Sequence, residues 1–464
     1  MLINKTENEK GMFSKAKYIS LLCVFVSTSC LAKEWYLEPS FSLRTEYDDN
    51  KRLLTDTFVQ SIRENGDNSK LSAYGIITSA EAKAGVRSDN YNVFFKGKVA
   101  IKEYFSDLDF DSEDFFLDLN ADYTLNERNV LGFSAGYNQE STLTAELDAT
   151  GLSQENIPRQ TWSVSPTWTH YLSENKYIQT TYSHQDVSYK QSNTTRFSDY
   201  VYDSVTLTFF HQWNDKLQNF LTAGWSKFAV PVRRSETDEY QINAGLNYSF
   251  SETWTASAMA GVRFTHTEGF RTVANSSLVN TGLPINLPNG PIIINGVSGQ
   301  VIDGLFFQDG IIIDQIPFTD DQTGLVFSFS TEKQFETGNI GGGYSRSTSP
   351  AGDGSLRTVD RFTLNYLQKI TKHLHFDLNA AIHITEATSN VDLNSDRTYY
   401  TVTPSLRWQF NRQLSLSGGY RYRRQEFESV NNNAGVNNTK SVGESNSVFI
   451  TLRYQWDKFS TQEF

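Results

Sequence analysis

Apolar and polar residues alternate along most of the chain, in segments of about ten residues that turn-forming residues separate. In the first segment, Trp35, Phe41 and Tyr47 share one face, while Glu38 and Arg44 share the other. Successive side chains of a β-strand point to opposite faces of the sheet. The period of two therefore predicts strands whose two faces meet different surroundings.

This pattern predicts eighteen strands. They span residues 35–47, 73–87, 91–103, 114–124, 130–138, 161–171, 177–188, 201–213, 217–228, 239–250, 254–266, 323–334, 339–347, 358–370, 374–385, 398–410, 414–426 and 447–457. Every second connection is tight, as at residues 88–90, and the intervening ones are longer. Short periplasmic turns and long extracellular loops are typical of outer-membrane barrels. We expect an all-β, transmembrane antiparallel β-barrel of about 18 strands, with both chain ends in the periplasm.

Composition agrees with this fold class. Mean hydropathy is −0.46 and aromatic residues make up 14% of the chain. No apolar run of about twenty residues lies outside the N-terminus, which excludes a helical membrane protein. A soluble β-sandwich or solenoid would also alternate, but Trp and Tyr at strand ends and the short and long connections favour the membrane barrel. A barrel of this size encloses an aqueous channel, so the polar faces should line a lumen.

The N-terminus has the pattern of a secretory signal. Lys15 and Lys17 precede an apolar stretch at residues 18–26, and small residues follow up to Ala32. We expect cleavage after Ala32, which leaves the barrel over residues 33–464. A lipoprotein acylated at Cys30 is the alternative, although the residue three positions earlier is a serine rather than an aliphatic residue.

Cysteine content and charge exclude several kinds of site. Both cysteines, Cys23 and Cys30, lie in the signal segment, so the chain after cleavage would have no disulfide, thiol nucleophile or cysteine metal site. The whole chain has a formal net charge of −12 and residues 1–32 contribute +2, so the remainder carries −14. This acidic balance disfavours nucleic acid as a partner.

Several short stretches are similar to a known family. They are Trp-Tyr-Leu-Glu-Pro (35–39), Tyr-Asp-Asp-Asn (47–50), Tyr-Ser-Arg-Ser-Thr-Ser-Pro-Ala-Gly-Asp-Gly (344–354), Leu-Ser-Gly-Gly-Tyr-Arg-Tyr-Arg (416–423) and Asn-Ser-Val-Phe-Ile-Thr-Leu (446–452). They resemble the Gram-negative outer-membrane barrels termed β-barrel porin type 2. Some members belong to exopolysaccharide gene clusters and resemble the outer-membrane conduit of an export machine. The resemblance implies a periplasmic polysaccharide-export protein as partner, and it implies no catalytic motif.

Strand parity predicts a basic wall in the lumen. It consists of Arg44, Arg407, Arg421, Arg423 and Arg453. Arginine suits carboxylate binding, so this wall is a candidate guide for an acidic polymer or a small anion. The alternative, which we favour, is a set of salt bridges along the wall with Glu38, Glu46 and Asp377.

Two further groups point inward by parity. A charge ladder comprises Glu81, Lys83, Lys96, Lys98, Asp118 and Asp122. Its alternating signs on adjacent strands favour structural ion pairs. Lumen aromatics are Tyr36, Phe94, Phe116, Tyr399 and Phe449. Their rings are suited either to stacking on sugars or to packing against an inserted loop.

The longest connection, residues 268–322, contains apolar runs that should not be exposed to water. We expect it to fold into the barrel mouth as a constriction or plug. The residues that would form the constriction are Ile293, Phe306, Phe307 and Ile312. The alternative is a cap outside the barrel.

Catalysis is not expected from the sequence. His184 has no nucleophilic serine in a recognisable frame with it, and neither HExxH nor a clustered carboxylate pair occurs in the sequence. We expect no enzyme activity, cofactor or metal. The first expectation is a conduit for an exported exopolysaccharide in the outer membrane of a Gram-negative bacterium. The alternatives are a diffusion porin for small solutes and an outer-membrane hydrolase. The expected surroundings are outer-membrane lipid, lipopolysaccharide and the barrel-assembly machinery.

Overall fold

A computed structural model describes residues 34–55, 72–106, 110–149, 156–190, 197–284, 290–294, 297–302, 305–388, 396–429 and 439–462. The expected signal segment, residues 1–32, lies outside the described residues. The strands are β1 (Glu34–Asp48), β2 (Ala73–Arg87), β3 (Tyr91–Phe105), β4 (Ser112–Asn126), β5 (Asn129–Ser141), β6 (Pro158–Ser173), β7 (Lys176–Tyr189), β8 (Tyr200–Asn214), β9 (Leu217–Val230), β10 (Ser235–Ser251), β11 (Trp254–Pro284), β12 (Gly290–Ile294), β13 (Val297–Ile302), β14 (Leu305–Phe335), β15 (Gly338–Pro350), β16 (Leu356–Lys369), β17 (Leu374–Ala387), β18 (Asp396–Gln409), β19 (Leu414–Ser429), β20 (Thr439–Gln455) and β21 (Phe459–Gln462), with helix α3 (Thr142–Ala149) and the short helix η5 (Pro231–Arg233). Within these residues, no helix combines the length and apolar character that a membrane crossing needs.

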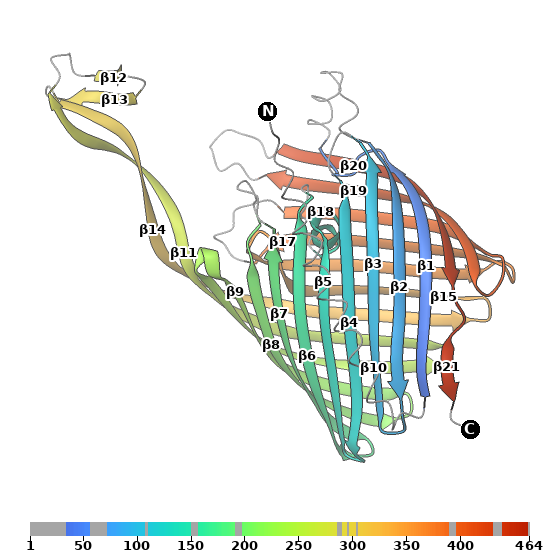
Figure 1. The fold of residues 1–464 in the computed structure, drawn as a ribbon. Helices are drawn as coiled ribbons and strands as arrows, with labels where there is room; N and C mark the ends of the chain where they lie inside the picture. Colours follow the sequence, from blue (N-terminus) through green and yellow to red (C-terminus); the bar gives the residue numbers. More distant parts are fainter. Residues whose placement is uncertain are drawn as a thin grey trace, which may run out of the picture.

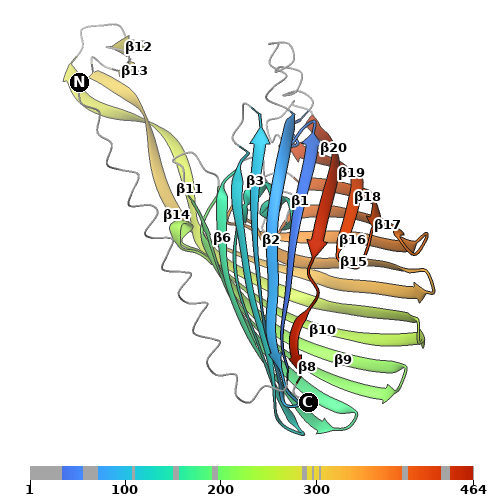
Figure 2. The same ribbon diagram turned by 45° about the vertical axis from the view of Figure 1, so that its right-hand side comes forward.

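The strands form one closed antiparallel barrel (Figure 1). Each wall strand pairs with the next, and β1 closes the barrel against β20 and β21, as Figure 2 shows. Counted over the described residues, eighteen strands make the wall, which confirms the predicted number. β12 and β13 lie outside the wall, and β21 continues the line of β20 along β1.

The two faces of the wall differ as the alternation predicts. Outward residues of β20 such as Val448 and Ile450 are 55% and 54% exposed. The inward residue between them in the chain, Phe449, is buried. Large apolar side chains are exposed over the outer face of nearly every wall strand, which is unfavourable in water and suits lipid.

The barrel has two unlike ends. At one, which we call the turn end, two-residue turns such as 127–128 and 174–175 join the strands. Glu34 pairs with Gln462 at this end, so both described chain ends lie there. The opposite end is called the loop end. Two of its connections, 231–234 and 351–355, are shorter than expected because their strands extend further than the alternation indicated.

Three prolines lie within strands, at positions 39, 166 and 404. Each coincides with an interruption of the ladder on one side only. The β6–β7 ladder skips Pro166, the β18–β19 ladder skips Pro404, and Pro39 faces the break between β20 and β21. The other neighbour remains paired in each case. Proline has no N–H to donate, so each break lies where a donor is missing.

The segment 268–322 does not form the expected constriction. β11 and β14 pair with each other along their lengths and continue past the wall as a two-stranded ribbon, with β12 and β13 at its far end. In Figure 1 this ribbon leaves the barrel at the upper left, away from the lumen. Mutual pairing satisfies the backbone groups on the facing edges of both strands, and the apolar runs in the sequence do not indicate this pairing. The side chains proposed for the constriction, those of Ile293, Phe306, Phe307 and Ile312, lie outside the described side chains.

The ribbon begins where two wall strands separate. β14 pairs with β15 only as far as Phe327 opposite Arg346. Beyond that point β14 remains with β11, whereas β15 remains with β16 up to Pro350 opposite Leu356. The loop-end part of the wall therefore has no backbone ladder between β14 and β15.

A buried ion pair joins three strands where the barrel closes. Arg423 of β19 donates to Asp48 of β1, with 2.6 Å between Nη2 and Oδ2. Ser445 of β20 donates to the other oxygen of the same carboxylate at 2.7 Å. Asp48 and Arg423 are 1% and 5% exposed, so neither charge has compensation from water.

We predict that Arg423→Met destabilises the barrel by about 3–5 kcal/mol, because it leaves Asp48 buried without its cation. Urea unfolding of the purified barrel in detergent measures this change. The matched control is Arg424→Met, one residue along the strand on the opposite face, where the guanidinium is more exposed and pairs with Glu426 and Glu444. Equal unfolding midpoints for the two variants would contradict the prediction.

Candidate functional site

Three arginines of the predicted basic wall contact acids at the loop end. The Glu46 carboxylate lies 2.7 Å from the Arg44 guanidinium and 3.7 Å from that of Arg421. Arg423 is held by Asp48, as described above. These cations therefore form wall salt bridges, and Glu46 is one of the partners expected from the sequence. The structure does not leave them as a free track for anions.

The other two arginines of the wall lie nearer the turn end. Arg407 is 3.6 Å from Asp377, which is also a partner expected from the sequence. Arg453 donates only a long hydrogen bond, 3.4 Å to the Ser40 hydroxyl, among the contacts of the described residues. Four arginines of the basic wall therefore lie within 3.7 Å of a carboxylate, and Arg453 has no such partner among the described residues.

The charge ladder forms only in part. Lys96 is 3.5 Å from Glu81. Lys83 and Lys98 instead lie over the rings of Phe94 and Phe116, at 4.3 and 5.3 Å from the ring centroids. Asp118 is the ladder partner of Lys96, and Asp122 is the ladder partner of the neutral Asn92. Neither acid forms an ion pair among the described residues.

The lumen aromatics contact mainly cations. Tyr36 lies under Lys458 at 4.7 Å, and Phe449 lies under Arg44 at 4.0 Å. Tyr399 differs, because it is buried and packs against Leu53. Packing against an inserted segment therefore applies to Tyr399, while the other rings support charged side chains.

The first element that fills the loop end is the segment 49–55, which we call the first mouth segment. It follows β1 and lies against the inner faces of β18, β19 and β20. Leu53 is 1% exposed, and its carbonyl accepts a hydrogen bond from Gln425 at 2.7 Å. The Asn50 amide donates to the carbonyls of Leu54 and Glu444 at 3.0 and 2.9 Å.

The backbone around this segment is shaped to hold it. Leu53 has a φ of 54°, which is costly for a branched side chain and persists only when its surroundings fix it. Gly443 of β20 lies directly behind, where a Cβ would come within 2.5 Å of the Leu53 carbonyl oxygen. Any other residue at 443 would push the first mouth segment away from the wall.

A polar cluster anchors the same segment to the opposite side of the seam. Lys51 donates to Glu46 at 2.5 Å and to the Tyr104 hydroxyl at 2.7 Å, and Tyr104 donates to the same carboxylate. Burial lowers the pKa of Lys51 to about 8, although the neighbouring Glu46 carboxylate acts to raise it. The Lys51 ammonium therefore loses its proton at a lower pH than an ordinary lysine does.

The second element is the β15–β16 turn with its flanking residues, 347–358, which we call the hairpin tip. Leu356 packs in a buried cluster with Val187, Tyr200 and Phe228. Those three residues have inward parity on β7, β8 and β9, which are not ladder neighbours of β16. The hairpin tip therefore lies inside the lumen at the loop end.

Polar contacts fix the hairpin tip to the far wall. Thr348 donates to Glu239 of β10 at 2.7 Å. Arg263 of β11 donates to Thr358 at 2.6 Å. The Ser198 amide donates to the Gly352 carbonyl at 2.8 Å. These bonds join strands on the two sides of the ladder break.

The turn itself is internally braced. Asp353 accepts from the Ser355 hydroxyl and from Arg357, both at 2.6 Å. Burial opposes the charge of Asp353, but the Arg357 guanidinium and the bonds from Ser355 outweigh it and hold the pKa of Asp353 below its ordinary value. Gly354 adopts a φ of 77°, which suits glycine at the turn.

The sequence contains a signal for the first mouth segment and another for the hairpin tip. Neither signal indicates that the segment fills the loop end of the lumen. Leu53 and Leu54 form an apolar pair within a polar connection, and Pro350 to Gly354 form a turn-rich stretch. Both lie in or next to stretches that carry the family resemblance, 47–50 and 344–354. Neither signal tells which way a connection folds.

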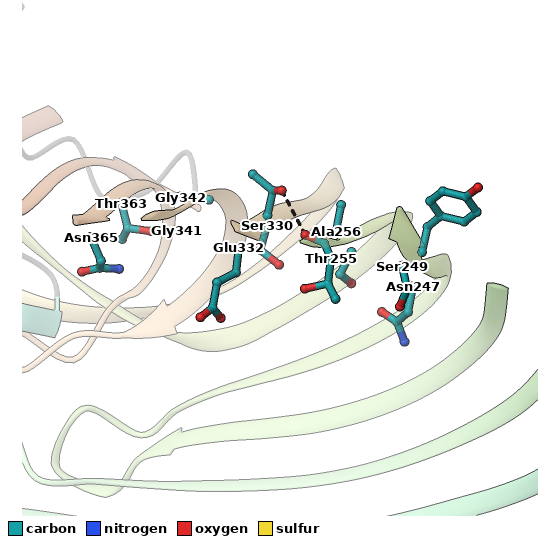
Figure 3. Close-up of a pocket in the computed structure, with 14 residues that line it drawn as sticks. Asn247, Ser249, Thr255, Ala256, Ser330, Glu332, Gly341, Gly342, Thr363 and Asn365 are labelled. Carbon is teal, nitrogen blue, oxygen red and sulfur yellow. Dashed lines mark hydrogen bonds between the residues drawn. The ribbon is translucent and has the colours of Figure 1, made fainter. Parts of the chain in front are cut away.

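The turn-end half of the lumen is more open. A hollow of about 460 Å³ lies on the inner wall of β10, β11, β14, β15 and β16. Figure 3 shows Asn247, Glu332 and Asn365 among the residues that line it. Its lining is mostly uncharged and polar, and the three glycines at 341–343 have no side chains that would fill it. The lumen therefore has a filled loop end above a polar, hollowed turn end.

Among solved structures, the chain is similar to several outer-membrane proteins at low identity and low TM-score. No family model matches the chain, and no curated protein matches it. The ferric-catecholate import receptor Fiu of E. coli K12, in its open form, is 10% identical, covering 90% of this chain and 81% of that one with a TM-score of 0.39. OccAB2 of Acinetobacter baumannii is 11% identical (92% and 98% covered, TM-score 0.41). OmpT, an outer membrane protein of Vibrio cholerae, in its trimer form, is 12% identical (91% and 99% covered, TM-score 0.34).

These likenesses carry no statement about substrate or mechanism. The barrel described above rests on the strand pairing of this chain itself. Within the described residues, no group of three or more His, Cys, Asp or Glu is placed to hold a metal ion.

We predict that Leu356→Asp releases the hairpin tip, because a carboxylate cannot remain in the cluster with Val187 and Phe228 without a large desolvation cost. Single-channel conductance in planar bilayers should rise, by roughly twofold or more if the mouth limits the current. Val232→Asp is the control, since Val232 is 73% exposed in a loop-end turn. A folded Leu356→Asp barrel with unchanged conductance would count against this role.

We predict a pH-dependent contribution from Lys51. The folded chain releases this proton at about pH 8, whereas an ordinary lysine keeps it to 10.5. Between these values the unfolded chain binds more protons, so stability rises with pH. The thermal midpoint of the wild type should therefore increase relative to Lys51→Met as the pH rises from about 8 towards 10.5. A constant difference between the two proteins across that window would refute the assignment.

Proposed function

We propose that this barrel is a gated outer-membrane conduit for an exported exopolysaccharide, and that it transports without catalysis. The observation that carries the proposal is the division of the lumen. Two separate segments, at 49–55 and 347–358, fill the loop end, while the turn end remains hollow and polar. A wide barrel that is open at all times would leak solutes, so a conduit that serves one polymer benefits from a mouth that is closed at rest.

The connections support an orientation for the barrel. Short turns face the periplasm in outer-membrane barrels, so we place the turn end in the periplasm and the filled loop end outside. A polymer would then enter through the hollowed half and leave past the first mouth segment and the hairpin tip. A periplasmic polysaccharide-export protein would dock on the ring of tight turns.

The closure is of a kind that can open. Individual hydrogen bonds, rather than a continuous strand ladder, attach both segments to the wall that they contact: Glu239 accepts from Thr348, Gln425 donates to Leu53, and Ser198 donates to Gly352. Such contacts can be exchanged for water or for a polymer while the barrel remains closed on itself. This favours a gated conduit over a diffusion porin for small solutes.

Deletion of the gene should abolish secreted exopolysaccharide, and expression of the intact chain should restore it. Polysaccharide in the culture medium is the measurement. Normal secretion by the deletion strain would reject the export function. In a second assay, liposomes that contain the purified barrel should swell slowly in small sugars. Rapid swelling would favour the diffusion porin.

A further inference from the structure

A cationic pocket lies on the inner wall at the turn-end half, on the side opposite the hollow of Figure 3 in the strand order. It has a volume of about 230 Å³ and is formed by β1, β2, β3 and β20. Its lining includes Glu38, Glu81, Lys83, Phe94, Lys96 and Arg453. All six have inward parity, so the pocket opens to the lumen.

Two lysines of this pocket face each other directly. Lys83 of β2 is the ladder partner of Lys96 of β3. Like charges directly opposite across a strand pair are destabilising. On their other sides, Lys83 is the ladder partner of Glu38 and Lys96 is that of Asp118, but neither pair forms an ion pair among the described residues. The Lys83 ammonium lies over Phe94, 4.3 Å from the ring centroid, rather than against a carboxylate. A ring face compensates a charge only weakly compared with an anion.

The acids of the pocket do not neutralise it. Glu81 is engaged by Lys96 at 3.5 Å. Arg453 makes only the 3.4 Å contact with Ser40, and Glu38 is the one remaining carboxylate that lines the pocket. Lys83 and Arg453 therefore share a single acid, which leaves an excess positive charge on the wall of an otherwise acidic protein.

The arginines of the loop end contact carboxylates directly. There, Glu46 and Asp48 take up Arg44, Arg421 and Arg423 at short distances. Each of these three arginines has a carboxylate within 3.7 Å, whereas Lys83 and Arg453 form no ion pair among the described residues.

We propose that the cationic pocket binds the carboxylate groups of an acidic saccharide as it enters the lumen. The Arg453 guanidinium and the Lys83 ammonium would bind a sugar carboxylate, and Phe94 would offer an apolar surface beside them for the ring. The role of an acidic saccharide as the transported substrate rests on the proposed export function. Its binding to the pocket can be measured without any export.

The test uses the purified full-length barrel in detergent and isothermal titration calorimetry at low salt. The probes are tetragalacturonate, which is acidic, and maltotetraose, a neutral chain of the same length. The wild type should bind tetragalacturonate more tightly than maltotetraose. The combined variant K83Q/K96Q/R453Q should bind the acidic probe at least about tenfold more weakly, which corresponds to the loss of one charge-assisted contact.

A matched control separates the pocket from general charge. The variant K216Q/K372Q/R412Q removes the same number of cations from exposed tight turns at the same end of the barrel, and it should bind tetragalacturonate as the wild type does. Equal binding of the two probes, absence of binding, or an equal loss in both triple variants would overturn the proposal.

Failure of this proposal is distinguishable from failure of the export function. If the deletion strain loses secretion but tetragalacturonate binding is absent or does not depend on the pocket, only the acidic substrate class is wrong. If binding depends on the pocket but the deletion strain secretes normally, the site stands and the export function fails.

Discussion

The structure depends on the requirement that backbone groups facing lipid find their partners within the wall. In hydrocarbon no water can satisfy an N–H or a C=O group, so a sheet in a membrane must close. β1 closes this barrel against β20 and β21, and the period of two follows because one face then meets lipid and the other meets the lumen. The prolines show how strictly the constraint acts. The ladder is interrupted beside each of them, on one side only, where the donor is missing.

This constraint explains what the sequence could predict. Strand positions and facing depend on local alternation, so the eighteen strands and the inward parity of Arg423 could be read from the chain. Neighbouring arginines illustrate the limit. Arg423 points inward and Arg424 outward as parity requires, but the partner of Arg423 is Asp48, which lies 375 positions away in the chain. Only the closure of the barrel brings these two residues together, and no local pattern encodes which inward acid lies nearest.

Connections are less predictable for a related reason. The apolar runs in residues 268–322 indicate that the segment must pair or pack, but not with what. The structure pairs its two halves with each other, and the mouth is filled instead by the first mouth segment and the hairpin tip. Leu53 and Leu356 each become buried against residues distant in the sequence, the first against Tyr399 and the second against Val187. Burial of apolar surface drives both arrangements, but an apolar residue in the sequence does not indicate which distant residue it will pack against.

The ribbon and the hairpin tip are two consequences of a single break in the wall. Past Phe327 and Arg346, β14 and β15 no longer share a ladder, so one edge of each strand has no strand partner there. β14 stays paired with β11 through its other edge, in a ribbon whose outer edges are open over most of the described length, which suits a position beyond the lipid, where water can reach them. β15 stays paired with β16, and their joined tip turns into the lumen, where Thr348 and Thr358 bond to the inner faces of β10 and β11. At this place, a few side-chain bonds hold together parts of the wall that elsewhere share a backbone ladder. A barrel that must remain closed on itself and still open its mouth would place its weakest contacts at this position.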